Sequence, residues 1–278
     1  MVSSRVPILF SAFLLLTVAA APSVAAVDLG ADLLNVAPTI LSISLSGLTS
    51  GTLTPSSGTT ASVTATVVAV DTNGFADITG VTVGIIKPDG STIHLAQAAA
   101  SFSSGSLLSA TYTKTLNMNF YDAAALTTDT YKVKAIATDA AAATGTNLLT
   151  LAVFNYGQLV AVNAPASLSL GSSLTPGVAG SIVSLGLQNY GNVQMDSQIS
   201  GTALSFSSNS MPVGSLAYSL ASDLSGSAAL TGSAVTLSSF DLGSGASSSK
   251  NVYFQLTPPE GLPAGTYTGT LTVAAISG

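Results

Sequence analysis

The sequence predicts an all-β protein made of two tandem antiparallel β-sandwich modules behind an N-terminal export signal. Apolar and polar residues alternate with a period of two in many short segments, and clusters of Gly, Pro, Asn and Asp separate those segments. The chain is 47% apolar, so it has enough apolar residues to fill a core in each module. Together these features are typical of sandwiches.

The N-terminus has the pattern of a secretory signal peptide. Arg5 is its only charge, an apolar run follows over residues 6–21, and small residues end it at Ala25 and Ala26. A retained membrane anchor is the alternative, but the run is shorter than the roughly 20 residues that a spanning helix needs. We therefore expect residues 1–26 to be removed by cleavage after Ala25 or Ala26.

The remaining chain divides at a change of pattern. Asn155-Tyr156-Gly157 closes a set of alternating segments, and a Pro-containing stretch follows. We predict a first sandwich over residues 27–157, a linker over 158–166 and a second sandwich over 167–278.

Several segments of the first module have one apolar face and one polar face, as half-buried strands do. Their apolar faces are Val63, Ala65, Val67 and Ala69; Val81, Val83 and Ile85; and Tyr131, Val133, Ala135 and Ala137. Asn73-Gly74 and Pro88-Asp89-Gly90 are strong turn signals between strands.

A tyrosine opens a late strand in this module. Tyr131 follows a crossing loop, in which we expect one helical turn capped by Asp122. This placement is similar to the tyrosine corner of immunoglobulin-like sandwiches. Thr266-Tyr267 repeats Thr130-Tyr131 before the last strand of the second module, which suggests related modules.

The second module contains three clear alternating segments. Their apolar faces are Val183, Leu185 and Leu187; Val252, Phe254 and Leu256; and Tyr267, Leu271 and Val273. Residues 205–249 are rich in Ser, Gly and Ala with weak periodicity, so we expect short strands and long loops there.

Three sequence runs resemble known envelope proteins. VAVDTNGFADITGVTVGIIKPDG (Val68–Gly90) resembles the immunoglobulin-like modules of secreted archaeal and some bacterial cell-surface proteins. YGNVQMDSQISGTAL (Tyr190–Leu204) and GLPAGTYTGTLTV (Gly261–Val273) look like the sandwich repeats of archaeal surface proteins and pilus-type subunits. The resemblance covers less than a quarter of the chain and implies the fold and an extracellular or cell-surface location.

Composition limits the partners. Charged residues make up 6% of the chain, against about 25% in soluble domains generally. Loss of Arg5 changes the formal charge from −6 to −7 and leaves no arginine, so nucleic acid is not expected as a partner. A weakly charged surface leaves self-association unopposed. We expect no transmembrane segment in the mature chain, and the absence of cysteine excludes disulfides.

The residues needed for common hydrolytic chemistry are missing or isolated. His94 is the single histidine, and no G-x-S-x-G elbow accompanies it, so we interpret it as a strand-surface residue. Glu260 is the single glutamate and lies in a Pro-rich turn. We predict no catalytic residues, although distant aspartates could still converge.

One loop offers oxygen ligands for a metal ion. Asp71, Asn73 and Asp77 lie close together in sequence and could bind calcium, and we expect no other cofactor. The alternative is a plain turn with Asx hydrogen bonds.

We therefore expect a non-enzymatic structural component of the cell envelope or of a surface filament, assembling with itself or with other envelope proteins through strand edges. One route is donation of residues 27–45 to a neighbour's sheet. The favoured alternative is that these residues form the first strand of their own sandwich, because adjacent elements usually pack together. The alternative function is an adhesin or glycan-binding module that presents loops 101–107 or 205–212. Surface glycans would then stack on tyrosines such as Tyr156, Tyr190, Tyr218 and Tyr253.

Overall fold

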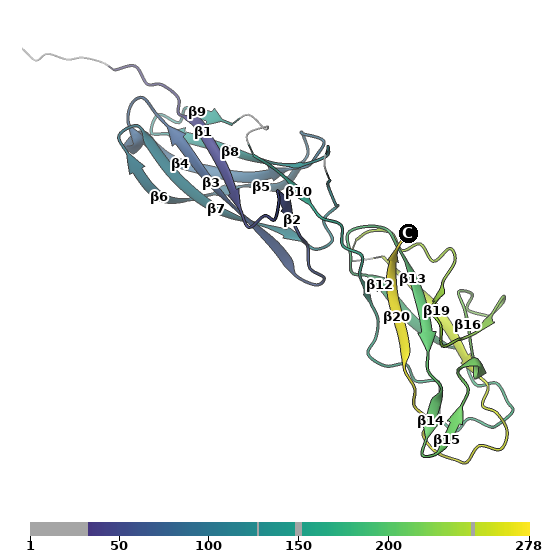
Figure 1. The fold of residues 1–278 in the computed structure, drawn as a ribbon. Helices are drawn as coiled ribbons and strands as arrows, with labels where there is room; N and C mark the ends of the chain where they lie inside the picture. Colours follow the sequence, from purple (N-terminus) through teal and green to yellow (C-terminus); the bar gives the residue numbers. More distant parts are fainter. Residues whose placement is uncertain (1–32, 127, 148–151, 246–247) are drawn as a thin grey trace, which may run out of the picture. The chain divides into compact units, whose positions relative to one another are not determined.

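The computed structural model describes residues 33–126, 128–147, 152–245 and 248–278, and it is all-β (Figure 1). The predicted signal peptide, residues 1–26, lies outside the described residues. Val36–Gly278 form one compact unit, in which the buried apolar side chains gather in two separate clusters. Among the described residues, helical geometry is confined to two short 3-10 turns, η1 (Phe75–Asp77) and η2 (Val213–Ser215). The prediction of an all-β chain is confirmed.

One sheet of the first sandwich has four strands in the order β1-β3-β7-β6, all antiparallel. These strands are β1 (Thr39–Ser46), β3 (Thr60–Val70), β7 (Ser109–Asn119) and β6 (Ser101–Ser106). The alternation predicted for β3 is confirmed, because Val63, Ala65, Val67 and Ala69 are all fully buried. β1 pairs with β3, so residues 39–46 form an edge strand of their own sheet.

The facing sheet has the order β2-β10-β8-β4-β5, with β9 also paired to β8. Its strands are β2 (Thr52–Leu53), β4 (Ile78–Ile86), β5 (Ile93–Ala99), β8 (Tyr131–Asp139), β9 (Thr144–Thr146) and β10 (Val153–Tyr156). All of its pairs are antiparallel except β2 with β10. The predicted turns are found between strands, where Gly74 and Gly90 have φ of 116° and 77°.

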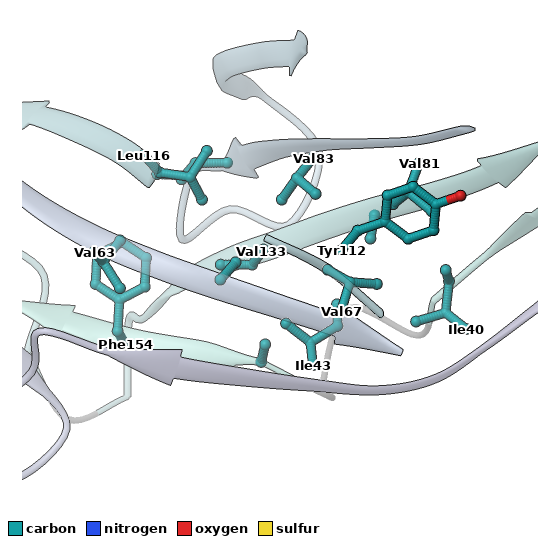
Figure 2. Packing of buried hydrophobic residues seen from close by; sticks show 14 of the residues in the cluster. Ile40, Ile43, Val63, Val67, Val81, Val83, Tyr112, Leu116, Val133 and Phe154 are labelled. Atoms are coloured by element: carbon teal, nitrogen blue, oxygen red, sulfur yellow. The ribbon is translucent and has the colours of Figure 1, made fainter. Parts of the chain in front are cut away.

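Both sheets contribute to a single core. Figure 2 shows Val63, Val67 and Leu116 of one sheet packed in the same layer as Val83, Val133 and Phe154 of the other. The two inner faces interdigitate as in other face-to-face sheet packings.

A side chain bridges a gap in the edge beside β8. Between β9 and β10, Asn147 replaces a paired strand residue: its Oδ1 accepts the N–H of Ala135 at 2.5 Å, and its Nδ2 donates to the carbonyl of Val133 at 3.1 Å. Asn147 is buried. Its amide therefore satisfies two backbone groups of β8 that water does not reach.

The second sandwich has a five-stranded sheet, β11-β12-β19-β16-β17, and a three-stranded sheet, β18-β13-β20, with every pair antiparallel. Its strands are β11 (Val162–Asn163), β12 (Val183–Asn189), β13 (Met195–Gly201), β16 (Leu216–Ser219), β17 (Ala228–Ala229), β18 (Val235–Thr236), β19 (Ser249–Leu256) and β20 (Leu271–Ser277). A separate hairpin joins β14 (Leu204–Phe206) to β15 (Asn209–Met211). β11 lies inside the range 158–166 that we expected to be a linker.

The Ser/Gly/Ala-rich stretch does form short strands, and it also supplies the second core. Leu230, Leu237, Phe240 and Leu242 from this stretch are buried beside residues of β12, β13 and β19. Phe206 and Leu220 of the same stretch are exposed, so only part of its large apolar residues fill the core.

The two tyrosines noted in sequence make comparable contacts. Tyr131 opens β8, and its hydroxyl donates to the carbonyl of Ala123 at 2.9 Å. The Tyr267 hydroxyl donates to the carbonyl of Pro263 at 3.1 Å. The last strand begins only at Leu271, so the expected strand start at Tyr267 is wrong. Tyr267 instead belongs to the loop that leads into β20.

Candidate functional site: open strand edges and an acidic cluster

Three edge strands, β1, β6 and β20, have a neighbouring strand on one side only. None of them contains a charged residue or a proline: they read TILSISLS, SFSSGS and LTVAAIS. Natural sheets usually protect long edges with lysine, proline or a covering segment. These edges lack the sequence devices that oppose pairing with another chain.

The backbone of β20 shows which of its groups are free. Met195 of β13 exchanges both backbone hydrogen bonds with Leu242, so its N–H and C=O point away from β20. Met195 lies opposite Ser277 in the β13–β20 register. Because backbone direction alternates along a strand, the N–H and C=O groups of Val273 and Ala275 also point away from β13. Among the described residues, no further backbone hydrogen bond reaches those two.

The side chains of β20 favour pairing at this edge. Leu271, Val273 and Ala275 are partly exposed and pack against the second core. An added strand would bury more of this apolar surface. The edge therefore offers both unpaired backbone groups and apolar contact.

An acidic cluster lies at one end of the first sandwich. Asp71 directly follows β3, Asp77 ends η1, and Asp139 ends β8. Each offers a carboxylate oxygen, and these oxygens all lie within 4.8 Å of one another. Ile78 pairs with Asp139 in the β4–β8 register, which brings the end of β8 next to η1.

Burial and hydrogen bonding distinguish the three carboxylates. Asp71 is 1% exposed and Asp139 is 2% exposed, whereas Asp77 is half-buried. Oδ1 of Asp71 accepts the N–H of Asn73 at 2.7 Å, and Oδ1 of Asp139 accepts the N–H of Ala143 at 2.7 Å. Oδ2 of Asp71 is buried and has no hydrogen-bond partner.

This cluster differs from the calcium site expected from sequence. The structure brings Asp71 and Asp77 together, but Asn73 is directed elsewhere, with its Oδ1 accepting the N–H of Val36 at 2.9 Å. Sequence reasoning missed Asp139, which belongs to a distant strand. The signal that could have found it is an acidic residue at the end of a strand predicted to pair beside Ile78.

His94 is not the strand-surface residue that we expected. Its Nε2 lies 3.0 Å from Oδ2 of Asp122, and its side chain is only 12% exposed. Asp122 Oδ2 also accepts the N–H of Asn119 at 2.6 Å, and the loop around Asp122 contains no helical turn, contrary to prediction. Glu260 is exposed in a turn.

Tyr131 packs between this pair and the core. Its ring centroid lies 5.2 Å from that of His94 and 5.7 Å from that of Phe154. Burial, and secondly the charge of Asp122, raise the pKa of Tyr131 to about 12. The same two causes, with Tyr131 as a third, raise the pKa of Tyr156.

The features expected of a glycan-binding module are placed differently. Residues 101–106 form β6 and residues 204–211 form the β14–β15 hairpin, so neither predicted loop is a loop throughout. Tyr156 is fully buried, and its hydroxyl donates to the carbonyl of Asn119 at 2.8 Å. Tyr156 therefore cannot act as a stacking platform.

Comparisons with known proteins do not assign a family or a function to this chain. No family model matches the chain, and no curated protein matches it. It is similar to a solved structure of a chaperone and tip adhesin complex described as vital for activation of CFA/I fimbriae biogenesis, with 13% identity and a TM-score of 0.32. The match covers 87% of this chain and 84% of the other. Similarity at this level carries no functional conclusion. In the described part of the chain, no helix has the length and apolar character needed to cross a bilayer.

Proposed function

We propose that the chain is a non-enzymatic extracellular component of a cell envelope or surface filament, and that it assembles through strand edges. The observation that carries this proposal is the open edge of β20, with outward backbone groups and partly exposed apolar side chains. Addition of a strand to such an edge satisfies the free N–H and C=O groups and buries apolar surface together.

The strand order of the first sandwich supports the extracellular assignment. Its sheets, β1-β3-β7-β6 and β10-β8-β4-β5, correspond to the A-B-E-D and G-F-C order of an immunoglobulin-like domain, with β5 added beside C. The hydrogen bond from Tyr131 to the carbonyl of Ala123 fits the tyrosine corner of that fold. We propose that the first sandwich is immunoglobulin-like, a fold common among cell-surface proteins.

The strand that pairs with β20 is proposed to come from the N-terminal segment of a second copy. Because β1 pairs with β3, residues 39–46 are already used, and donation falls to the segment before them. In that segment Val27, Leu29, Ala31 and Leu33 alternate with other residues. Leu33 is 89% exposed and Leu34 is 84% exposed, so the described end of this segment has apolar side chains without a core to fill.

A proline substitution tests the edge. Ala275→Pro removes an outward N–H and leaves the bonds between β20 and β13 intact, so we expect a folded chain that no longer assembles. Ala274→Pro is the contrasting variant, because the N–H of Ala274 faces β13 and its loss should destabilise the second sandwich. Residues 27–278 of each variant would be compared by analytical ultracentrifugation and negative-stain electron microscopy, with circular dichroism as the test of folding.

Deletion of residues 27–36 tests the donor segment independently of the β20 edge, because the shortened chain keeps the edge and lacks the donor. If the proposal is correct, the shortened chain stays monomeric but still binds a synthetic peptide of residues 27–36. Identical assembly of the full and shortened chains would reject the donor segment. Assembly of Ala275→Pro at the wild-type level would reject the β20 edge.

A further inference from the structure

The three carboxylates of the acidic cluster lie close enough to repel one another. Three carboxylate oxygens from Asp71, Asp77 and Asp139 lie within 4.8 Å of one another, and two of the three residues are buried. Negative charges at this separation repel one another, and a protein interior screens that repulsion less than water does. A cation bound among these oxygens would offset that repulsion.

One oxygen of the cluster residues, Oδ2 of Asp71, has no hydrogen-bond partner. The other oxygen of this carboxylate already accepts the N–H of Asn73, whereas Oδ2 is buried and has no hydrogen-bond partner. Buried polar atoms are nearly always satisfied, and beside two other carboxylates a bound cation is the partner that would satisfy this one. A cation at the centre of the three oxygens would satisfy Oδ2 and offset all three charges.

We propose that Asp71, Asp77 and Asp139 bind a calcium ion. The ligand set is oxygen only, which excludes the nitrogen and sulfur coordination that zinc and copper favour. Mg²⁺ is held in proteins through one or two carboxylates and retains several waters, whereas Ca²⁺ accepts mono- and bidentate carboxylates with coordination of about six to eight oxygens. Three carboxylates supply up to six oxygens, and water completes the shell.

The position of the ligands gives the ion a structural role. β3 belongs to one sheet of the first sandwich and β8 to the other, and η1 ends the connection from β3 to β4. One ion would therefore join both sheets and the intervening turn. The same turn holds Asn73, which accepts the N–H of Val36, so calcium would also fix the point where the N-terminal segment meets the sandwich.

Calcium itself is the probe for the test. Residues 27–278 would be freed of metal with EDTA, and Ca²⁺ binding would be measured by isothermal titration calorimetry and by thermal unfolding at constant ionic strength. We expect one site with a dissociation constant in the range of extracellular modules, about 10⁻⁴–10⁻³ M, and a higher unfolding temperature with calcium. Asp71→Asn should abolish both effects, and without calcium it should be at least as stable as the wild type because it removes a buried charge.

Asp129→Asn is the matched control, since Asp129 is exposed outside the cluster and its variant should respond to calcium as the wild type does. Should Asp71→Asn fail to fold, Asp77→Asn changes the half-buried ligand and should weaken binding at least tenfold. Absence of binding to the wild type, or wild-type binding by a folded Asp71→Asn, would overturn the proposal. An equal effect of Mg²⁺ would overturn the assignment to calcium. All three ligands belong to one chain, so calcium binding does not depend on the assembly proposed above.

Discussion

Oδ2 of Asp122 lies 3.0 Å from Nε2 of His94 and 2.6 Å from the backbone N of Asn119. One carboxylate oxygen therefore connects β5 to the loop that follows β7. Both donors are at least partly buried, so neither can exchange this partner freely for water. The pair is a structural tie in the first sandwich.

Replacement of Asp122 should loosen this tie. Asp122→Ala leaves the Asn119 N–H and the His94 ring without their acceptor, and we expect a loss of about 1–3 kcal/mol in the free energy of unfolding. Urea unfolding measures the change. Asp129→Ala, at an exposed position of the same loop, should leave the free energy within about 0.5 kcal/mol of wild type. Equal effects of the two substitutions would contradict the role of Asp122.

Stability should fall at alkaline pH through Tyr131. The pKa of Tyr131 is raised to about 12, so the folded state holds this proton more tightly than the unfolded state, whose tyrosines ionise near about 10. The contribution of Tyr131 is fully present below pH 10 and is lost as pH rises through 12. Tyr131→Phe should flatten part of this decline in the free energy of unfolding, measured between pH 8 and 12. Tyr121→Phe, at a residue 40% exposed, is the control for loss of a tyrosine hydroxyl outside the core.

How far the sequence predicts this molecule depends on whether the information is local. Alternation identified β3, β4 and β8 because a half-buried strand repeats its environment at every second residue. The same argument failed for β6 and for the β14–β15 hairpin. Their Ser/Gly-rich sequences have weak periodicity, and edge strands and hairpins can form through backbone pairing with little burial.

The sites were harder to predict because they join distant segments. Asp71 and Asp77 were visible as neighbours, but Asp139 joins them only through the β4–β8 register. His94 likewise seemed isolated, since its partner Asp122 belongs to a loop in which we expected a helical turn. A lone polar residue in a strand gives no local sign of a partner that the fold brings to it.

Asn147 makes a second test of a buried polar contact. Asn147→Ala would leave the N–H of Ala135 and the C=O of Val133 unsatisfied inside the first sandwich. We expect the free energy of unfolding to fall by about 1–3 kcal/mol for each group that water cannot reach. Asn117→Ala removes an exposed hydrogen bond to Ser62 and should cost about 1 kcal/mol or less. Chemical denaturation measures the free energy of unfolding of both variants, and a larger loss for Asn147→Ala would show that its amide takes the place of a paired strand beside β8.

The two buried clusters predict two cooperative units. Phe154 belongs to the first cluster and Phe254 to the second, and each is essentially inaccessible to solvent. Truncation of either to alanine should cost about 3–5 kcal/mol, because it removes apolar contacts and leaves a cavity. If residues 27–157 and the following chain fold as separate domains, calorimetry of the wild type shows two transitions, and each variant lowers the temperature of one transition only. A single transition that both variants shift equally would mean that the two cores unfold together, and would reject the predicted division into domains.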